Sequence, residues 1–350
     1  MSAKREQVTM AEVVQDMVAT RYAAVRDGGA GLIDLSSHGR LLISGVESVT
    51  FLNGLITNDM NSLTVNSWMP AAFPNVQGRL LGAVRVIHRN DGFLIDTESV
   101  THEKILRLVE RFTPAGDFHV TDITHETALL SVQGRKAEQV IRTVLGEVAA
   151  NVERQTVVKT QLENGSDVCV IRATHTAEDG FDLFVGASEA ANLWDSLVKA
   201  GAQPIGLEAL ETLRIEAGIP RYGKDMDETT VVSEANLDEA VSFTKGCYVG
   251  QEIIARIKYR GHVAKKLTGL VFEGELPLES GAKILSVEDQ EIGRVTSLTF
   301  SPRLDRSIAL GYVKYDYLAP GTHVKVSAGD DEIRGTVADL PFVRGSWYAD

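Results

Sequence analysis

The feature that most constrains the fold is a run of short apolar segments after residue 263. Each has the length and β-branched content of a strand, and turns rich in Gly, Pro and Asp separate them. Short strands at this spacing are typical of a small barrel or sandwich. We therefore expect a separate C-terminal β domain over residues 263–350, with strands at 267–272, 283–287, 293–299, 308–313, 323–327 and 333–337.

Residues 1–262 have a different pattern, which predicts a mixed α+β region. A capping-box pattern, Thr9 with Glu12, predicts a helix that ends at 27–29. We expect further helices at about 49–56, from Ser99 onward, and at 135–145, 188–200 and 204–220, and strands at 31–36, 40–44, 80–87, 93–96, 117–124, 127–133, 156–161, 168–173 and 181–185. There is no regular βαβ alternation, dinucleotide fingerprint or phosphate-binding P-loop.

Charge and cysteine content narrow the function classes. The chain has 35 basic and 48 acidic residues, a net charge of -13, which argues against a nucleic-acid partner. Two cysteines are too few for a disulfide framework, and the first ten residues are polar, unlike a secretory signal. No uncharged apolar run has membrane-spanning length. We expect a cytoplasmic protein that binds neither nucleic acid nor membrane.

The segment Lys245–Glu252, which reads KGCYVGQE, carries the densest chemistry in the sequence. The thiolate of Cys247 would be the reactive form, and Lys245 or a helix beginning near Gln251 and Glu252 would lower its pKa. The alternative is that Cys247 is a small buried apolar residue beside a solvated lysine. Cys169 lies in an apolar strand, where packing is its expected role.

A second candidate is Arg214, on the flank of the apolar stripe of the 204–220 helix. A guanidinium there needs an anion, either a ligand or a protein group such as Asp182. A purely structural Arg–Asp pair is the alternative reading. Asp225 and Asp227 are an acid pair of the kind that is usually solvated. His119 and His125 have no partners at zinc-ligand spacing, so no metal site is predicted.

With these residues in place, the chain resembles the YgfZ family, folate-binding proteins related to the T-protein (aminomethyltransferase) of glycine cleavage. The octapeptide 245–252 carries the most specific part of the resemblance. Moderately specific matches are the segments 34–36, 51–54, 57–59, 178–182, 212–218 and 222–228.

The resemblance implies a tetrahydrofolate cavity in the α+β region, followed by a C-terminal β-barrel. It implies that Asp182, an aspartate where glutamate is usual, holds the pterin ring, and that Arg214 holds a folate carboxylate. T-proteins carry an aspartate at the position matching Gly82 or Ala83, and neither residue can replace it.

Three hypotheses follow. In the first, the protein supports assembly or repair of iron–sulfur enzymes, with Cys247 as the functional thiol, Lys245 lowering its pKa, and Gln251 and Glu252 positioning it. In the second, it is a folate-dependent one-carbon (aminomethyl) transferase or demethylase that takes its carboxylate from elsewhere, such as Asp96 or Asp59. In the third, it is a folate-binding module in which the thiol is inert.

Overall fold

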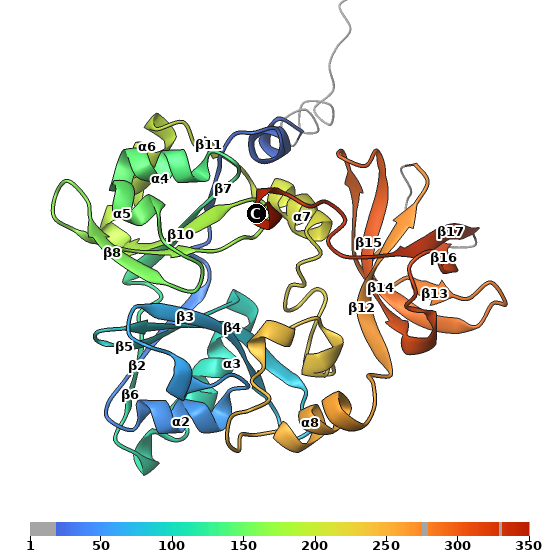
Figure 1. The fold of residues 1–350 in the computed structure, drawn as a ribbon, viewed down its shortest axis with the longest axis horizontal. Coiled ribbons are helices and arrows are strands. Elements are labelled where there is room, and N and C mark those ends of the chain that lie inside the picture. Colours follow the sequence, from blue (N-terminus) through green and yellow to red (C-terminus); the bar gives the residue numbers. More distant parts are fainter. Residues whose placement is uncertain (1–18, 275–278, 329–330, 350) are drawn as a thin grey trace, which may run out of the picture.

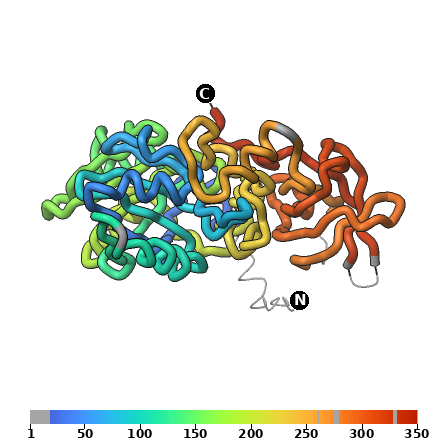
Figure 2. The backbone as a smooth tube through the Cα atoms, turned by 90° about the horizontal axis from the view of Figure 1, so that it is seen from below, coloured from blue at the N-terminus to red at the C-terminus, as the bar shows by residue number. Residues whose placement is uncertain are grey.

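The computed structural model describes residues 19–274, 279–328 and 331–349. Figure 1 shows three lobes, two built on open sheets and one on a barrel, with helix α7 between them. Seen from below, in Figure 2, the barrel forms one end of an elongated molecule and the two sheets form the other. The start of the predicted first helix lies outside the described residues, but residues 19–26 are helical.

The first lobe is a five-stranded sheet in the order β3-β4-β5-β2-β6. Its strands are β2 (Gly39–Ser44), β3 (Ser67–Pro74), β4 (Leu80–Arg89), β5 (Gly92–Thr97) and β6 (His119–Asp122), and its helices are α2 (Ser48–Leu55) and α3 (Ser99–Glu110). The predicted strands 80–87 and 93–96 are confirmed, and they form the antiparallel hairpin β4–β5. Gly92 has φ +137°, and a Cβ there would lie 2.5 Å from the carbonyl oxygen of Ile43, so only glycine fits.

Strand β3 is a long element that the sequence did not predict. It pairs antiparallel with β4 from Ser67 to Pro74 and contains two prolines, Pro70 and Pro74. Proline removes a ladder donor, so a strand that contains it is confined to a sheet edge. β3 is the edge strand of its sheet, which explains why a strand forms here despite the unfavourable composition.

The second lobe is a six-stranded sheet in the order β11-β1-β7-β10-β9-β8. Its strands are β1 (Gly31–Asp34), β7 (Thr127–Gln133), β8 (Val157–Gln161), β9 (Asp167–Arg172), β10 (Gly180–Gly186) and β11 (Gln203–Pro204), with helices α4 (Ala137–Leu145), α5 (Glu147–Ala150) and α6 (Ala190–Lys199) packed against it. All pairs are antiparallel except β1 with β11.

The two sheets face each other through a shared apolar core. Ile87 and Leu94 from the first sheet pack with Ile171 and Phe184 from the second, and Leu213 of α7 joins them. Apolar contacts of this kind fix the relative position of the lobes, because separating them would return the buried area to water. Polar residues that point into this layer are therefore held in place.

Helix α7 (Leu207–Glu216) connects the sheets to the barrel. Its Ile215 packs against barrel residues Leu267, Ile308 and Leu310. Helix α8 (Gln251–Arg260) follows a long connection, and short 3-10 helices occur at Met60–Ser62, Thr113–Ala115, Ala187–Glu189, Val232–Glu234, Asp238–Ala240, Tyr315–Tyr317 and Ser346–Tyr348.

The third lobe confirms the predicted C-terminal β-barrel. Six strands close in the order β12-β15-β14-β13-β16-β17. They are β12 (Lys265–Phe272), β13 (Lys283–Leu285), β14 (Glu291–Ser301), β15 (Arg306–Lys314), β16 (His323–Ala328) and β17 (Asp331–Ala338). The segment after β17 leaves the barrel and returns to α7 and the second sheet (Figure 1), where Ser346 hydrogen-bonds Glu178.

Candidate functional site

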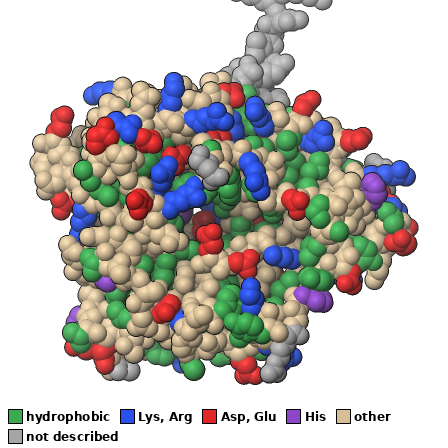
Figure 3. All heavy atoms as spheres, viewed as in Figure 1, with side chains coloured by type: hydrophobic (Ala, Val, Ile, Leu, Met, Phe, Trp, Pro, Cys, Tyr) green, Lys and Arg blue, Asp and Glu red, His purple; other side chains and the backbone are tan. Residues whose placement is uncertain are grey.

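A cavity of about 80 Å³ lies where the two sheets meet α7, and we call it the central cavity. Its wall combines apolar, acidic, basic and imidazole side chains. They are Leu35, Ser37, His38, Glu98, His175, Leu207, Leu210, Glu211, Arg214, Ile219, Pro220 and Arg221. In Figure 3, basic and acidic side chains surround a hollow near the middle of the visible face.

Five charged or titratable side chains form a continuous chain across the two lobes. The histidines at its two ends line the central cavity. Nδ1 of His38 lies 3.2 Å from Asp96, which accepts a 2.8 Å bond from Nε of Arg85. Arg85 also donates to Asp182, whose two carboxylate oxygens lie 3.1 and 3.0 Å from Nε2 of His175. We call this the Arg85 network.

The Arg85 network keeps its two aspartates ionised. Burial favours a neutral carboxyl, but Arg85 and His38 hold the pKa of Asp96 well below its usual range. For Asp182 burial acts the same way, and His175 and Arg85 reverse it. Burial opposes protonation of His38, but Asp96 and Glu98 together raise its pKa above the usual value.

The predicted folate residues Asp182 and Arg214 do not pair with each other. Asp182, on β10, is fully buried and faces Arg85 and His175. Arg214, on α7, turns toward the barrel, where it bonds Asp225 and Ser297, and it also bonds Glu211 within its helix. The suggested Arg214–Asp182 pair is wrong because the two side chains face different lobes.

Asp182 and Arg214 nevertheless belong to one region. Arg214 lines the central cavity, whereas Asp182 reaches the cavity through His175. Sequence analysis missed His175, His38 and Arg221, which line the cavity directly. Isolated histidines carry no local pattern. The one usable signal was that a buried Asp182 needs a cationic or donor partner close by.

Asp225 is not solvated. It is buried and accepts bonds from Arg214 and from Thr296 of β14. Among the described residues, no group of three or more His, Cys, Asp or Glu side chains is arranged to hold a metal ion. None of the helices in the described ranges is long and apolar enough to cross a membrane.

Cys247 is exposed, and the central cavity is not lined by it. Lys245 is buried, and its Nζ donates to the carbonyl oxygens of Asn53, Ile56 and Asn58 at 2.7, 3.0 and 2.6 Å. The ammonium thus binds the carbonyl end of α2, and burial lowers the pKa of Lys245 to about 8. Its role in activating the thiol stays a prediction.

The predicted helix start after the cysteine is confirmed, because α8 begins at Gln251. Gly250 before it has φ +79°, and a Cβ there would lie 2.4 Å from the carbonyl oxygen of Asn75. Nε2 of Gln251 lies 3.4 Å from the carbonyl oxygen of Lys245, whereas Glu252 is exposed. The predicted positioning roles of Gln251 and Glu252 stay predictions.

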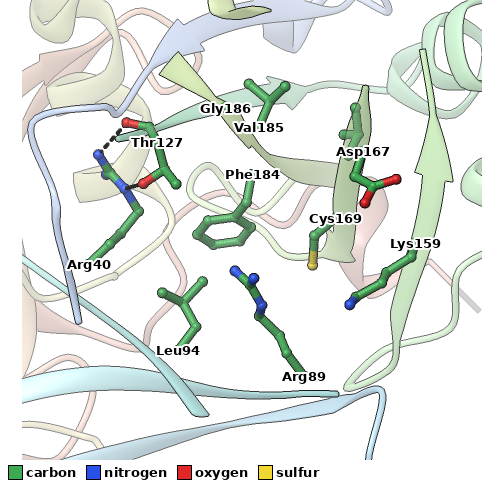
Figure 4. A pocket seen from close by; sticks show the side chains of 11 residues that line it. Arg40, Arg89, Leu94, Thr127, Lys159, Asp167, Cys169, Phe184, Val185 and Gly186 are labelled. Carbon is green, nitrogen blue, oxygen red and sulfur yellow. Dashed lines mark hydrogen bonds between the residues drawn. The ribbon is translucent and has the colours of Figure 1, made fainter. Parts of the chain in front are cut away.

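A second cavity, of about 200 Å³, lies at another edge of the inter-sheet layer (Figure 4). Arg89 and Lys159 point toward the thiol of Cys169 there, and Arg40 bonds Thr127. Burial raises the pKa of Cys169 to about 11, so the thiol is protonated near neutral pH. Cys169 packs in the shared core, as predicted.

Gly82 and Ala83, the residues that the resemblance matches to the T-protein aspartate, both lie on β4. A Cβ on Gly82 would lie 3.0 Å from Ile105 of α3, on the side away from the second sheet. Side chains alternate along a strand, so Ala83 faces the same side as Arg85. Of the two substitute carboxylates, Asp96 belongs to the Arg85 network, whereas Asp59 caps a 3-10 helix and interacts electrostatically with Lys245.

Comparison with known families assigns both parts of the chain. Residues 4–245 match the GCVT N-terminal domain, and residues 265–344 match the glycine cleavage T-protein C-terminal barrel domain. The chain belongs to the glycine cleavage T-protein family. Its mixed α+β region and closed barrel are therefore the T-protein fold.

Individual T-protein relatives match nearly the whole chain. The aminomethyltransferase of Rubrobacter xylanophilus is 35% identical over 331 residues, which cover 93% of this chain and 86% of the relative. The aminomethyltransferase of Shouchella clausii is 31% identical over 333 residues, covering 93% and 90%. The solved glycine cleavage system aminomethyltransferase T of Bartonella henselae superposes with a TM-score of 0.85 at 24% identity, covering 93% and 90%, and shares the fold.

Proposed function

We propose that this T-protein family member binds tetrahydrofolate in the central cavity and carries out one-carbon chemistry there. The observation that carries the proposal is that the side chains lining the central cavity match the different parts of a folate. His38 and His175 offer polar atoms to a pterin edge, leucines offer apolar contact, and Arg221 offers a cation to a carboxylate. Bound tetrahydrofolate would supply the nitrogen atoms that carry the one-carbon unit.

Arg221 is better suited than Arg214 to hold a folate carboxylate. Arg214 is buried and saturated by protein partners. The Arg221 side chain is 35% exposed, and its nearest carboxylates, on Glu98 and Glu211, lie 3.4 and 3.8 Å away. A loosely held guanidinium can turn to a ligand at little cost. We assign Arg214 to shaping the cavity and Arg221 to the ligand.

The central cavity must widen to admit a whole folate. Its 80 Å³ is well below the about 300 to 1,000 Å³ of typical small-molecule sites. The groups that can move are at the rim. Arg221 and Glu98 are held by long contacts, and Leu207, also at the rim, is 57% exposed. An exposed leucine at a cavity mouth fits apolar contact with a ligand.

The test is calorimetric titration of the whole protein with tetrahydrofolate under anaerobic conditions. Arg221→Met should weaken binding about tenfold or more, because a charge-assisted bond is lost. Arg107→Met, on an exposed α3 arginine, is the matched control and should leave binding unchanged. Absence of binding by the unmodified protein would refute the proposal. Formation of methylene-tetrahydrofolate from an amine donor then tests transfer, as the relatives' name suggests.

A second candidate function rests on the exposed thiol. Cys247 lies in the octapeptide that resembles the YgfZ family, so the protein can be proposed to support iron–sulfur enzymes, with folate as a second ligand. Replacing Cys247 with alanine in the host should lower the activities of iron–sulfur enzymes. Thr244→Ala, an exposed change in the same loop, is the control. Equal activities in the two strains would exclude this candidate.

A further inference from the structure

Each of the two cavity histidines is anchored through one ring nitrogen. Nε2 of His175 faces both oxygens of Asp182, and Nδ1 of His38 faces Asp96. An ionised carboxylate only accepts hydrogen bonds, so the nitrogen that faces it carries a hydrogen. The buried aspartates thus fix both the tautomer and the ring orientation of the histidines.

The second nitrogen of each ring is left for a ligand. Nδ1 of His175 has no hydrogen-bond partner within the described part of the chain. Nε2 of His38 lies 3.9 Å from Glu98, beyond hydrogen-bond distance. The His38 and His175 side chains are 15% and 22% exposed and line the same cavity. Two Asp–His dyads therefore line one cavity, and each has a second ring nitrogen that makes no hydrogen bond within the described residues.

Charge balance links the two dyads. Arg85 contributes one positive charge and Asp96 and Asp182 contribute two negative ones, all with side chains at most 15% exposed. One proton on the imidazoles would balance these three charges, and Glu98, 3.9 Å from Nε2 of His38, adds a negative charge on the His38 side. Because uncompensated charge is costly away from water, this arrangement favours a proton on His38.

We propose that the central cavity is an acid–base site in which His38 is the acid and His175 is the base. This rests on the proposed folate function and names the residues that would move protons in it. In the step, Nε2 of the His38 imidazolium gives its proton to a lone pair on one ligand atom. Nδ1 of neutral His175 takes a proton from an N–H of the ligand, whose bonding pair stays on that nitrogen. The number of protons is conserved.

The surroundings of the two rings support this division of roles. His38 faces Asp96 and Glu98, with Arg85 as the opposing cation, and its pKa is raised. His175 faces Asp182 and Arg85, and the α7 groups that share its cavity, Glu211 and Arg214, are paired with each other. The second carboxylate beside His38 favours the proton on that ring.

The first test needs no ligand. Nitrogen-15 NMR of the imidazoles in the whole protein, assigned with His38→Gln and His175→Gln, reports the tautomer and titration of each ring from pH 5 to 9. At pH 7 we expect an imidazolium at His38 and hydrogen on Nε2 of His175, the nitrogen that faces Asp182. Asp96→Asn should shift the His38 transition to lower pH, and Asp182→Asn should shift the His175 tautomer. Two neutral rings that are insensitive to these changes would overturn the inference.

The second test separates this inference from the proposed function. Tetrahydrofolate affinity of the unmodified protein should fall as pH rises through the His38 transition, and His38→Gln should remove that fall. His38→Gln and His175→Gln should each weaken binding about tenfold. His125→Gln, an exposed change, is the control. Tight binding with an unchanged pH profile in both variants refutes the inference alone. Absence of binding refutes the proposed function, and the NMR test still decides the dyads.

Discussion

Two buried arginines, Arg26 and Arg85, each bridge two carboxylates. The two networks differ in their end groups, the side chains that bind the carboxylates from the other side. Arg26 bridges Glu178 at 3.0 Å and Glu216 at 2.9 Å, as Arg85 bridges Asp96 and Asp182. The outer oxygens of the two glutamates are occupied by hydroxyl and backbone donors. These donors are Tyr22, Ser301 and Ser346.

The end groups decide what each network can do. Hydroxyl and amide donors do not titrate near neutral pH, so the Arg26 network holds a fixed charge and joins the N-terminal helix, second sheet, α7, barrel strand β14 and C-terminal segment. Imidazoles titrate in this range, and those of the Arg85 network line a cavity. The first network is a structural joint, and the second contains the groups that the proposed acid–base site requires.

The largest expected effect is on the structural joint. Arg26→Met leaves Glu178 and Glu216 buried without their cation, which should lower the free energy of unfolding by about 3 to 5 kcal/mol. Urea denaturation at pH 7 measures it. Arg107→Met, on an exposed i,i+4 pair with Glu103, should cost under about 0.5 kcal/mol. The histidine titrations of folded Arg26→Met should match the unmodified protein, and a change there would break the contrast.

A buried cation that donates its hydrogen bonds to carbonyl oxygens sharpens the contrast. Lys245→Met removes the donor shared by three carbonyls at the end of α2, and we expect a loss of about 2 to 3 kcal/mol in unfolding free energy. Lys258→Met, on the adjacent α8, is the control and should be near neutral. Lys245→Met should not alter tetrahydrofolate affinity, because this side chain does not line the central cavity. Weakened binding would show that the octapeptide reaches the folate site.

Acid titration should destabilise both networks, by a smaller effect than the two substitutions above. The pKa values of Asp96, Asp182 and Glu178 are depressed by folding. Their stabilisation is therefore full above about pH 4, the range of unfolded carboxyls, and is lost as pH falls through the folded values. Stability measured by urea denaturation should fall below that pH, and less steeply in Asp182→Asn. An identical slope in that variant would contradict the assignment.

Raising the pH through the imidazole range should affect the Arg85 network and not the Arg26 network, which contains no histidine. Folding raises the pKa of His38, so its stabilising contribution is complete below about pH 6.5 and is lost as pH rises through the folded value. Stability should decline slightly over this range in the unmodified protein and not in His38→Gln. His125→Gln, which changes an exposed ring, should retain the decline.

The sequence predicted secondary-structure elements better than it predicted which side chains contact each other. The barrel, the β4–β5 hairpin and α7 follow from local periodicity and turn residues, which need no knowledge of the rest of the chain. Arg214 was recognised as a charge beside an apolar stripe, and Asp182 was singled out through the resemblance to T-proteins. Their partners were not, because Asp182 meets Arg85 across the layer between two sheets, 97 positions away. Long-range pairs of this kind depend on how the lobes dock.

The smallest expected change in stability concerns the two cysteines, of which Cys247 is exposed and Cys169 is buried. Cys247 is exposed, and Cys247→Ala should change unfolding free energy by less than about 0.5 kcal/mol.

Cys169 is buried with its pKa at about 11, so in the folded protein a thiol reagent at pH 8 should modify Cys247 and reach Cys169 only after unfolding. One equivalent of rapid reaction in the unmodified protein and none in Cys247→Ala would agree with this. Rapid reaction in Cys247→Ala would mean that the layer between the sheets opens, and the Arg85 network could then not be treated as buried.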